Sequence, residues 1–483
     1  MASYTLSTFP GATPNVVSLF MDNLGNAIAG STTGIYYSSN SGKSWLQSDT
    51  TVGSVQSVFM DQSGNAIAVG GGEDNGLYYS QNHGQTWAQS LAGIFREVFM
   101  DQSGNAIALG NDDNGIYYSQ DRGQSWTVSS QTTGYFYSFF MDQSVNAIAV
   151  GENGIYYSQD RGHTWIVSSQ TTGYFESVFM DQSVNAIAAS DAGLYYSQDR
   201  GETWALSLVG NFQVVFMDQS VNAIACEYSA GIYYSSNNGK TWSASNQIIG
   251  TFSSIFMDQN GNAIAGNYET GGLLYSSDYG HTWNPTNVTP LVHSVFMDLK
   301  GNRLSGGDQT YYFAALVCFK EDTQILTDKG YVAIQSLKKG DLVKTVNDFI
   351  PVYAIGKREI FHPATEYRDK DQLYKCSPEH FQVFEDLVIT GCHSILVDDF
   401  KEGEREKTIE INGDTYVTEK KYRLPACVDA RTTVYETPGN YTIYHFALEN
   451  DDYYNNYGVY ANGLLVETCS KRYLMELSNM DMV

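Results

Sequence analysis

The chain has few cysteines, few basic residues and no long apolar run. Six cysteines in 483 residues are too sparse for the disulfide framework of a small secreted protein. Lysine and arginine number 27 against 53 acidic residues, and the net charge of −26 disfavours binding to nucleic-acid phosphates or anionic lipid surfaces. The longest apolar run, Phe313–Phe319, has seven residues and is too short to span a membrane. These features disfavour a nucleic-acid-binding function and exclude a membrane-spanning segment.

Glycine, by contrast, is abundant with 45 residues, and one short motif recurs throughout the first two-thirds of the chain. The motif is Phe-Met-Asp, and its copies are separated by 37 to 41 residues. A repeat with a period near 40 residues indicates a β-propeller or a solenoid. The eight copies begin at Phe20, Phe59, Phe99, Phe140, Phe179, Phe216, Phe256 and Phe296.

Each repeat unit contains four short strand-like segments separated by turn residues. In one unit these are Ser57–Asp61, Asn65–Ala68, Gly76–Ser80 and Thr86–Ser90. Runs of four or five residues rich in β-formers, with Gly, Asn and Asp between them, predict an antiparallel blade. Four-stranded units at this period favour a β-propeller.

The turn between the third and fourth segments follows a more specific pattern, Ser-x-Asp-x-Gly-x-x-Trp. It resembles the Asp box, or BNR repeat, of sialidase-type propellers. In the families that carry it, this box is a fold element away from the catalytic centre, and we interpret it as one here because a catalytic centre is needed only once. Asn replaces Asp in the copies that end at Trp45, Trp87 and Trp242. The other copies pair Asp121 with Trp126, Asp160 with Trp165, Asp199 with Trp204, and Asp278 with Trp283.

The number of blades depends on how the repeat region ends. The eighth copy has only three strand-like segments, the last being Thr310–Val317. A segment from the N-terminus, Tyr4–Phe9, is available as the missing fourth strand, and such pairing would close the ring. We therefore favour eight blades, with seven as the alternative.

The resemblance to sialidases does not extend to their activity. Those enzymes bind the substrate carboxylate with three arginines. Residues 1–317 contain five arginines, but three of these lie inside the Asp boxes on the periphery of the blades. Only Arg96 and Arg303 remain, and the region has eight basic residues against 25 acidic ones. We expect a binding or structural surface for an unknown protein or glycan, and a glycan-binding or sialidase-like role ranks third among our hypotheses.

At residue 318 the repeat ends and basic residues become more frequent. Three blocks, Cys318–Val343, Leu387–Val397 and Tyr444–Val466, resemble in order the blocks of a Hint domain, the all-β module shared by inteins and Hedgehog proteins. The predicted organisation is an all-β chain: a propeller over 1–317, a Hint domain over 318–469 and a tail over 470–483.

The Hint resemblance implies a self-cleavage site. Cys318 would attack the carbonyl of Val317 and convert the amide into a thioester. His393 would protonate the leaving amine, and Thr390 would orient either His393 or the amide. His445 stands where inteins carry an Asp. We include it as a proton shuttle, the alternative being that the loss of the Asp weakens activation.

The end of the Hint region departs from the pattern of splicing inteins. They close with His-Asn, whereas this chain has Glu467-Thr468 before Cys469. Thr cannot cyclise as Asn does, so complete splicing is not expected. The reaction that remains is a single-turnover cleavage by water or another nucleophile. Because Val317 is β-branched, we expect the attack on its carbonyl to be slow.

The first hypothesis is thus a self-processing precursor that releases or attaches the propeller. The second is a structural or surface protein, such as a virion component, whose Hint domain is inactive. We expect no cofactor and no metal, since Cys376 and Cys427 lack metal-ligand spacing. The N-terminus lacks the pattern of a secretory signal, which favours a cytoplasmic or virion-associated protein. The acidic run 398–410 is interpreted as a solvated loop.

Overall fold

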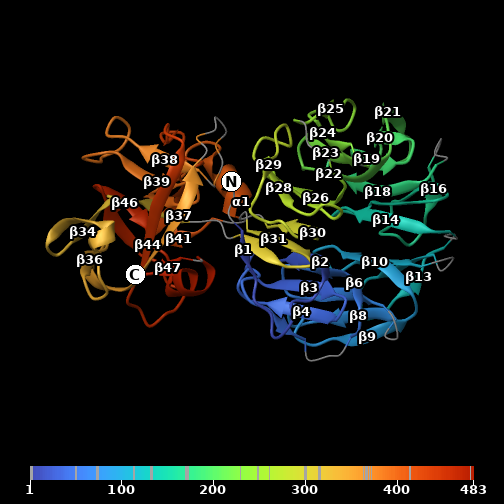
Figure 1. Cartoon of the computed structure of the whole chain (residues 1–483), viewed down its shortest axis with the longest axis horizontal. Coiled ribbons are helices and arrows are strands. Elements are labelled where there is room, and N and C mark those ends of the chain that lie inside the picture. The colour runs from blue at the N-terminus through green and yellow to red at the C-terminus, as the bar shows by residue number, and fades with distance from the viewer. Residues whose placement is uncertain are drawn as a thin grey trace. The chain divides into compact units, whose positions relative to one another are not determined.

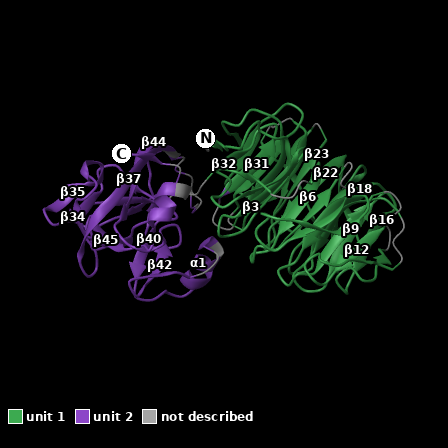
Figure 2. Ribbon diagram, turned by 90° about the horizontal axis from the view of Figure 1, so that it is seen from below, with its two compact units in different colours: residues 1–298, 303–313 green, residues 299–302, 314–483 purple. Residues whose placement is uncertain are grey.

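A computed structural model of the chain divides into two compact units (Figure 2). The first holds the described residues up to Asp298 together with Arg303–Phe313, and the second holds those from Val317 to Val483. The structure describes residues 4–48, 52–71, 75–111, 115–130, 134–168, 173–228, 230–246, 250–259, 261–298, 302–313, 317–362, 364, 368, 370, 372–412, 415–478 and 480–483. Among these residues, no helix has both the length and the hydrophobicity needed to cross a bilayer.

The described part of the first unit contains eight antiparallel sheets of four strands each, which follow one another along the chain (Figure 1). The first four blades are β2–β5 (Val16–Met21, Ala27–Ser31, Gly34–Ser38, Leu46–Gln47), β6–β9 (Val55–Met60, Ala66–Gly70, Gly76–Ser80, Ala88–Ala92), β10–β13 (Phe95–Met100, Ala106–Gly110, Ile116–Ser119, Thr127–Val128) and β14–β17 (Phe136–Met141, Ala147–Gly151, Gly154–Ser158, Ile166–Val167). The next three are β18–β21 (Phe175–Met180, Ala186–Ser190, Gly193–Ser197, Ala205–Val209), β22–β25 (Phe212–Met217, Ala223–Glu227, Gly231–Ser235, Ser243–Ala244) and β26–β29 (Phe252–Met257, Ala263–Asn267, Leu273–Ser276, Asn284–Pro285).

The eighth blade closes the ring with a strand from each end of the repeat region. It consists of β30 (Val292–Met297), β31 (Arg303–Gly307), β32 (Tyr311–Phe313) and β1 (Thr5–Leu6). Thr5 pairs with Tyr312, so the N-terminus supplies the missing fourth strand as predicted. Eight blades are confirmed, and β1 pairs with the edge of β32 that a three-stranded blade would leave open.

The phenylalanines of the repeated Phe-Met-Asp motif form a closed ring. Each contacts the phenylalanine of the next blade with ring centroids 4.3 to 5.9 Å apart, and Phe296 meets Phe20 at 4.7 Å. The Asp of the motif closes the following turn. In the second blade, buried Asp61 accepts hydrogen bonds from the backbone of Ser63 and Asn65 and from the Asn65 amide. The repeat therefore encodes both the contact between blades and the turn within each blade.

The Asp box links the third and fourth strands of a blade. The Asp121 carboxylate accepts bonds from the backbone and hydroxyl of Ser125 and from the Ser119 hydroxyl. Partial burial would raise the pKa of Asp121, but these bonds outweigh it, so the pKa lies below its ordinary value. The Trp126 indole donates to the carbonyl of Gly123 at 3.0 Å. Gly123 has φ of +76°, a conformation that favours glycine.

The second unit is built mainly from strands. Two long strands, β37 (Phe349–His362) and β44 (Gly439–Leu448), pair antiparallel through its centre. The remaining elements are β33 (Phe319–Lys320), β34 (Gln324–Thr327), β35 (Gly330–Ala333), η3 (Ile334–Ser336), β36 (Leu342–Lys344), β38 (Leu373–Cys376), β39 (Leu387–Thr390), β40 (Ser394–Val397), α1 (Glu404–Asn412), β41 (Val417–Thr418), β42 (Lys421–Pro425), β43 (Thr433–Val434), β45 (Gly458–Ala461), β46 (Leu464–Glu467), η4 (Tyr473–Leu477) and β47 (Asp481–Met482).

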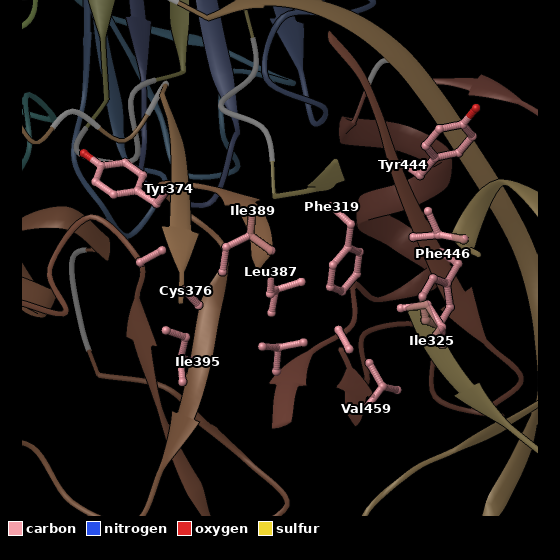
Figure 3. Close-up of a cluster of buried hydrophobic side chains, with 14 of the residues drawn as sticks. Phe319, Ile325, Tyr374, Cys376, Leu387, Ile389, Ile395, Tyr444, Phe446 and Val459 are labelled. Carbon is pink, nitrogen blue, oxygen red and sulfur yellow. The ribbon is translucent and has the colours of Figure 1, made fainter. Parts of the chain in front are cut away.

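The core of this unit surrounds Phe319. Figure 3 shows its ring between Ile389 and Leu387 on one side and Phe446 on the other. The interpretation of residues 398–410 as a loop was wrong for its second half, because α1 begins at Glu404 and buries Ile411 against the core.

Candidate active site

Cys318 is held at the start of β33, where three strands meet. The next residue, Phe319, pairs with Ile389 of β39 and with Tyr444 of β44. Thr390 ends β39 and His445 follows Tyr444, so this register brings both predicted site residues to the cysteine. Cys318 is fully buried, as are His393 and His445. The structure thus collects the four predicted catalytic residues in one place.

Thr390 holds the peptide unit that would be broken. The N–H of Cys318, which belongs to the Val317–Cys318 amide, donates to Thr390 Oγ1 at 2.9 Å. The Thr390 N–H in turn donates to the Cys318 carbonyl at 3.0 Å. Thr390 therefore holds Cys318 through both its N–H and its carbonyl, which fixes the nitrogen that would become the leaving amine.

His393 follows β39 in a tight turn, with its N–H donating to the Thr390 carbonyl at 3.0 Å. Its Nε2 lies 3.1 Å from the Glu467 carbonyl oxygen. Since a carbonyl only accepts, Nε2 carries the proton and donates it to that oxygen, which leaves Nδ1 as the basic nitrogen. Nδ1 is buried and has no hydrogen-bond partner among the described residues.

Burial lowers the pKa of His393, and the charge of Glu467 and the backbone of Cys318 oppose this effect only in part. His445 lies 5.3 Å away, measured between ring centroids, and neither of its nitrogens has a hydrogen-bond partner in the described part of the chain. Burial, and then repulsion from His393, hold the pKa of His445 well below its ordinary value. Both imidazoles are therefore neutral at pH 7.

The thiol is also in its uncharged form. Burial raises the pKa of Cys318 far above its ordinary value, although the positive charge of Arg358 acts in the opposite direction. The resting site thus contains a thiol and two neutral imidazoles. A base must take the thiol proton before the sulfur can act as a nucleophile.

Tyr473 is a site residue that the sequence analysis missed. Its hydroxyl accepts the N–H of Val317 at 2.9 Å, across 156 positions of sequence. Burial, and then the nearby Cys318 thiol, raise the pKa of Tyr473 well above its ordinary value. Cys318 also shares a buried cluster with Cys469, Leu474 and Met480. Only a match to a related structure, and no local pattern, would have pointed to this part of the tail.

The residues that replace the His-Asn pair of splicing inteins have structural partners. Glu467 is buried and forms an ion pair with Arg423, with Oε2 and Nε 3.2 Å apart. The Thr468 N–H donates to the Tyr457 carbonyl, and Thr468 Oγ1 accepts the Tyr457 N–H at 3.0 Å.

The other predicted residues lie in the propeller unit. All the named Asp-box residues, from Asp121 to Trp283, sit in the turns between the third and fourth strands of their blades. No group of three or more potential metal ligands occurs among the residues that the structure describes.

Comparisons with known proteins agree with this division. A family model described as a Hint domain matches residues 317–472, and one described as a BNR/Asp-box repeat matches residues 195–206 and 233–244. No curated protein sequence matches the chain.

Among solved structures, the computationally designed Ika8 protein superimposes with a TM-score of 0.52 and 8% identity, over 64% of this chain and 99% of its own. The C-terminal WD40 domain of Sif2 gives a TM-score of 0.50 and 10% identity, over 65% of this chain and 98% of its own. Identities this low speak to the fold alone. The two family models, together with the eight closed blades, show that the chain is an Asp-box β-propeller fused to a Hint domain.

Proposed function

We propose that the chain is a self-processing precursor that cuts itself once between Val317 and Cys318. The observation that carries this proposal is the hydrogen bond from the Cys318 N–H to Thr390 Oγ1, beside His393, whose Nδ1 has no hydrogen-bond partner among the described residues. A thiol, a held amide and an available base are the groups that an N–S acyl shift needs.

In the first step, Cys318 Sγ attacks the carbonyl carbon of Val317 through a five-membered ring. The S–C bond forms and the C–N bond breaks. The thiol proton passes to His393 Nδ1 and from there to the nitrogen of Cys318, which leaves as an amine. His445, next to His393, is an alternative carrier for the same proton.

In the second step, water or another nucleophile attacks the thioester carbon and the C–S bond breaks. With water, the products are a carboxylate at Val317 and a free thiol at Cys318. The propeller then ends at Val317 and serves as the binding or structural module, either free or attached to the nucleophile. The Glu467–Arg423 ion pair and the bonds of Thr468 support a reaction that stops here, without splicing.

The test is the intact mass of the purified full chain, with Cys318→Ala as the matched control, incubated with and without dithiothreitol. We expect a fragment ending at Val317 from the wild type only, in larger amount with the thiol. Full-length protein in every sample would refute the proposal.

A second candidate is an inactive Hint domain that serves only as a folded part of a surface protein. It is favoured by the complete burial of Cys318 and His445. The same mass measurement separates the two candidates.

A further inference from the structure

The described residues of the C-terminal segment, 470–478 and 480–483, pack against the reaction site. Its strand β47 pairs with β37, where Met482 lies opposite Gly356. On its other edge, Gly356 pairs with His445. The segment is therefore one strand away from a predicted catalytic histidine.

Gly356 leaves the space that this segment fills. A Cβ atom at Gly356 would lie 2.7 Å from Met480 Cβ, 2.9 Å from Met482 Cε and 3.2 Å from Leu474 Cδ1. Leu474 and Met480 belong to the same buried cluster as Cys318. The segment is thus fitted closely to the site and does not lie loosely over it.

The turn that carries Tyr473 is itself fixed. The Tyr473 N–H donates to Ser470 Oγ at 3.1 Å, and the Ser478 hydroxyl donates to the Leu474 carbonyl at 2.7 Å. Before the turn, Lys471 Nζ contacts Glu449 Oε2 at 2.8 Å. These contacts hold the Tyr473 ring in position before any chemistry occurs.

Two hydrogen bonds then flank the carbonyl that is attacked. Thr390 holds the N–H on the Cys318 side, and Tyr473 holds the N–H of Val317 on the other side. Together they restrict rotation about the Val317 backbone, so the carbonyl keeps one orientation relative to Cys318 Sγ. The Tyr473 bond contributes to this orientation without contacting the atoms that react, and orientation of this kind lowers a barrier.

We propose that Tyr473 is a positioning residue for the acyl shift at Val317 and that the described residues of the C-terminal segment, 470–478 and 480–483, are part of the reaction site. This inference rests on the proposed function. It implies that the segment must stay in place for the first step to proceed.

The test compares Tyr473→Phe with Tyr441→Phe in the full chain. Tyr441 packs against the same cluster and its hydroxyl donates to the Thr437 carbonyl at 2.9 Å, so it is a matched control for the loss of one tyrosine hydroxyl. At saturating dithiothreitol the cleavage rate equals the rate of thioester formation. We expect Tyr473→Phe to lower this limiting rate roughly 3- to 10-fold, the effect of one lost hydrogen bond, and Tyr441→Phe to leave it unchanged.

A merely protective role for Tyr473 would alter the dependence on thiol concentration and not the limiting rate. An unchanged limiting rate in Tyr473→Phe therefore overturns the proposal. Absence of cleavage in the wild type refutes the proposed function, and the positioning role with it.

A second measurement does not depend on cleavage. In the full chain with Cys318→Ala, amide hydrogen exchange at Val317 should be slow, and adding Tyr473→Phe should make it at least fivefold faster. The amide of position 318, which bonds to Thr390, serves as the internal control and should stay protected. Equal exchange at Val317 with and without the Tyr473 hydroxyl overturns the contact on which the inference depends.

Discussion

The pH dependence of cleavage offers a quantitative test of the proton transfer. Burial raises the pKa of the Cys318 thiol above its ordinary value of 9.0 and lowers that of His393 below 6.5. Over the whole interval between these two ordinary values, the dominant form of the site is a protonated thiol beside a neutral imidazole. In the proposed mechanism this is the reactive form, because the proton moves from the sulfur to Nδ1 and then to the leaving nitrogen.

The pH dependence of the limiting cleavage rate follows from these protonation states of Cys318 and His393. No proton is exchanged with solvent before the amine leaves, so the limiting rate should change by no more than about twofold between pH 7 and 9. It should fall only at lower pH, where His393 becomes protonated and loses its basic nitrogen. Attack by a free thiolate would instead rise about tenfold per pH unit up to the raised pKa of the thiol.

The assay follows the appearance of the Val317 fragment by mass spectrometry at saturating dithiothreitol. His393→Gln is the informative variant, since its amide can still donate to the Glu467 carbonyl but cannot carry a proton. We expect it to be slower at pH 7 by about 100-fold or more and to gain the steep rise with pH. A steep rise in the wild type, or a flat profile in His393→Gln, would show that His393 does not transfer the proton.

Three further results are expected. All seven tryptophans lie in the propeller, so their fluorescence reports its unfolding in urea. Gly123→Ala, whose Cβ would lie 2.5 Å from Ile67 Cγ2, should lower the free energy of unfolding by about 2–4 kcal/mol. Gly11→Ala, whose Cβ would have no described atom within 4 Å, should lower it by about 1 kcal/mol, and equal losses would contradict the packing argument. The pKa values of Asp121, Asp160 and Asp199 are lowered, so their charged forms stabilise the propeller at a pH above the ordinary pKa of 3.8, and this stabilisation is lost as the pH falls. The triple Asp→Asn variant, in which each Asn can form the bonds that Asn82 forms in its own box, should lose less stability between pH 5 and 3 than the wild type. An equal loss in the two proteins would argue against this assignment. Finally, mass spectrometry of the incubated chain should detect no fragment beginning at Cys469, because Thr468 cannot cyclise; such a fragment would mean that the second half of splicing survives.

Much of the propeller was predictable because its information is local and repeated. The Phe-Met-Asp motif sets the contact between blades and occurs eight times, and the Asp box sets a turn and occurs seven times. The closing strand β1 was predictable because a ring with a three-stranded blade needs a partner for its open edge. In the Hint unit, Cys318, Thr390 and His393 were recognisable from sequence blocks, and the structure brings them together.

The remaining features depend on contacts between distant residues. The bond between Val317 and Tyr473 leaves no periodic or local signal in a short C-terminal segment. The Glu467–Arg423 pair likewise joins two strands that are separate in sequence. Helix α1 was missed because its charged residues were interpreted as a solvated loop, although Glu, Arg and Lys also favour helices and Ile411 anchors the last turn in the core.

The most direct test of the central claim is to trap the acyl group on Cys318. The full chain is incubated with hydroxylamine, and the C-terminal group of the released propeller is identified by mass, with Cys318→Ala as the control. A thioester predicts a hydroxamate at Val317 in the wild type and no fragment in the variant. A fragment of equal amount from both proteins, or none from either, would contradict the proposal that Cys318 cleaves the chain.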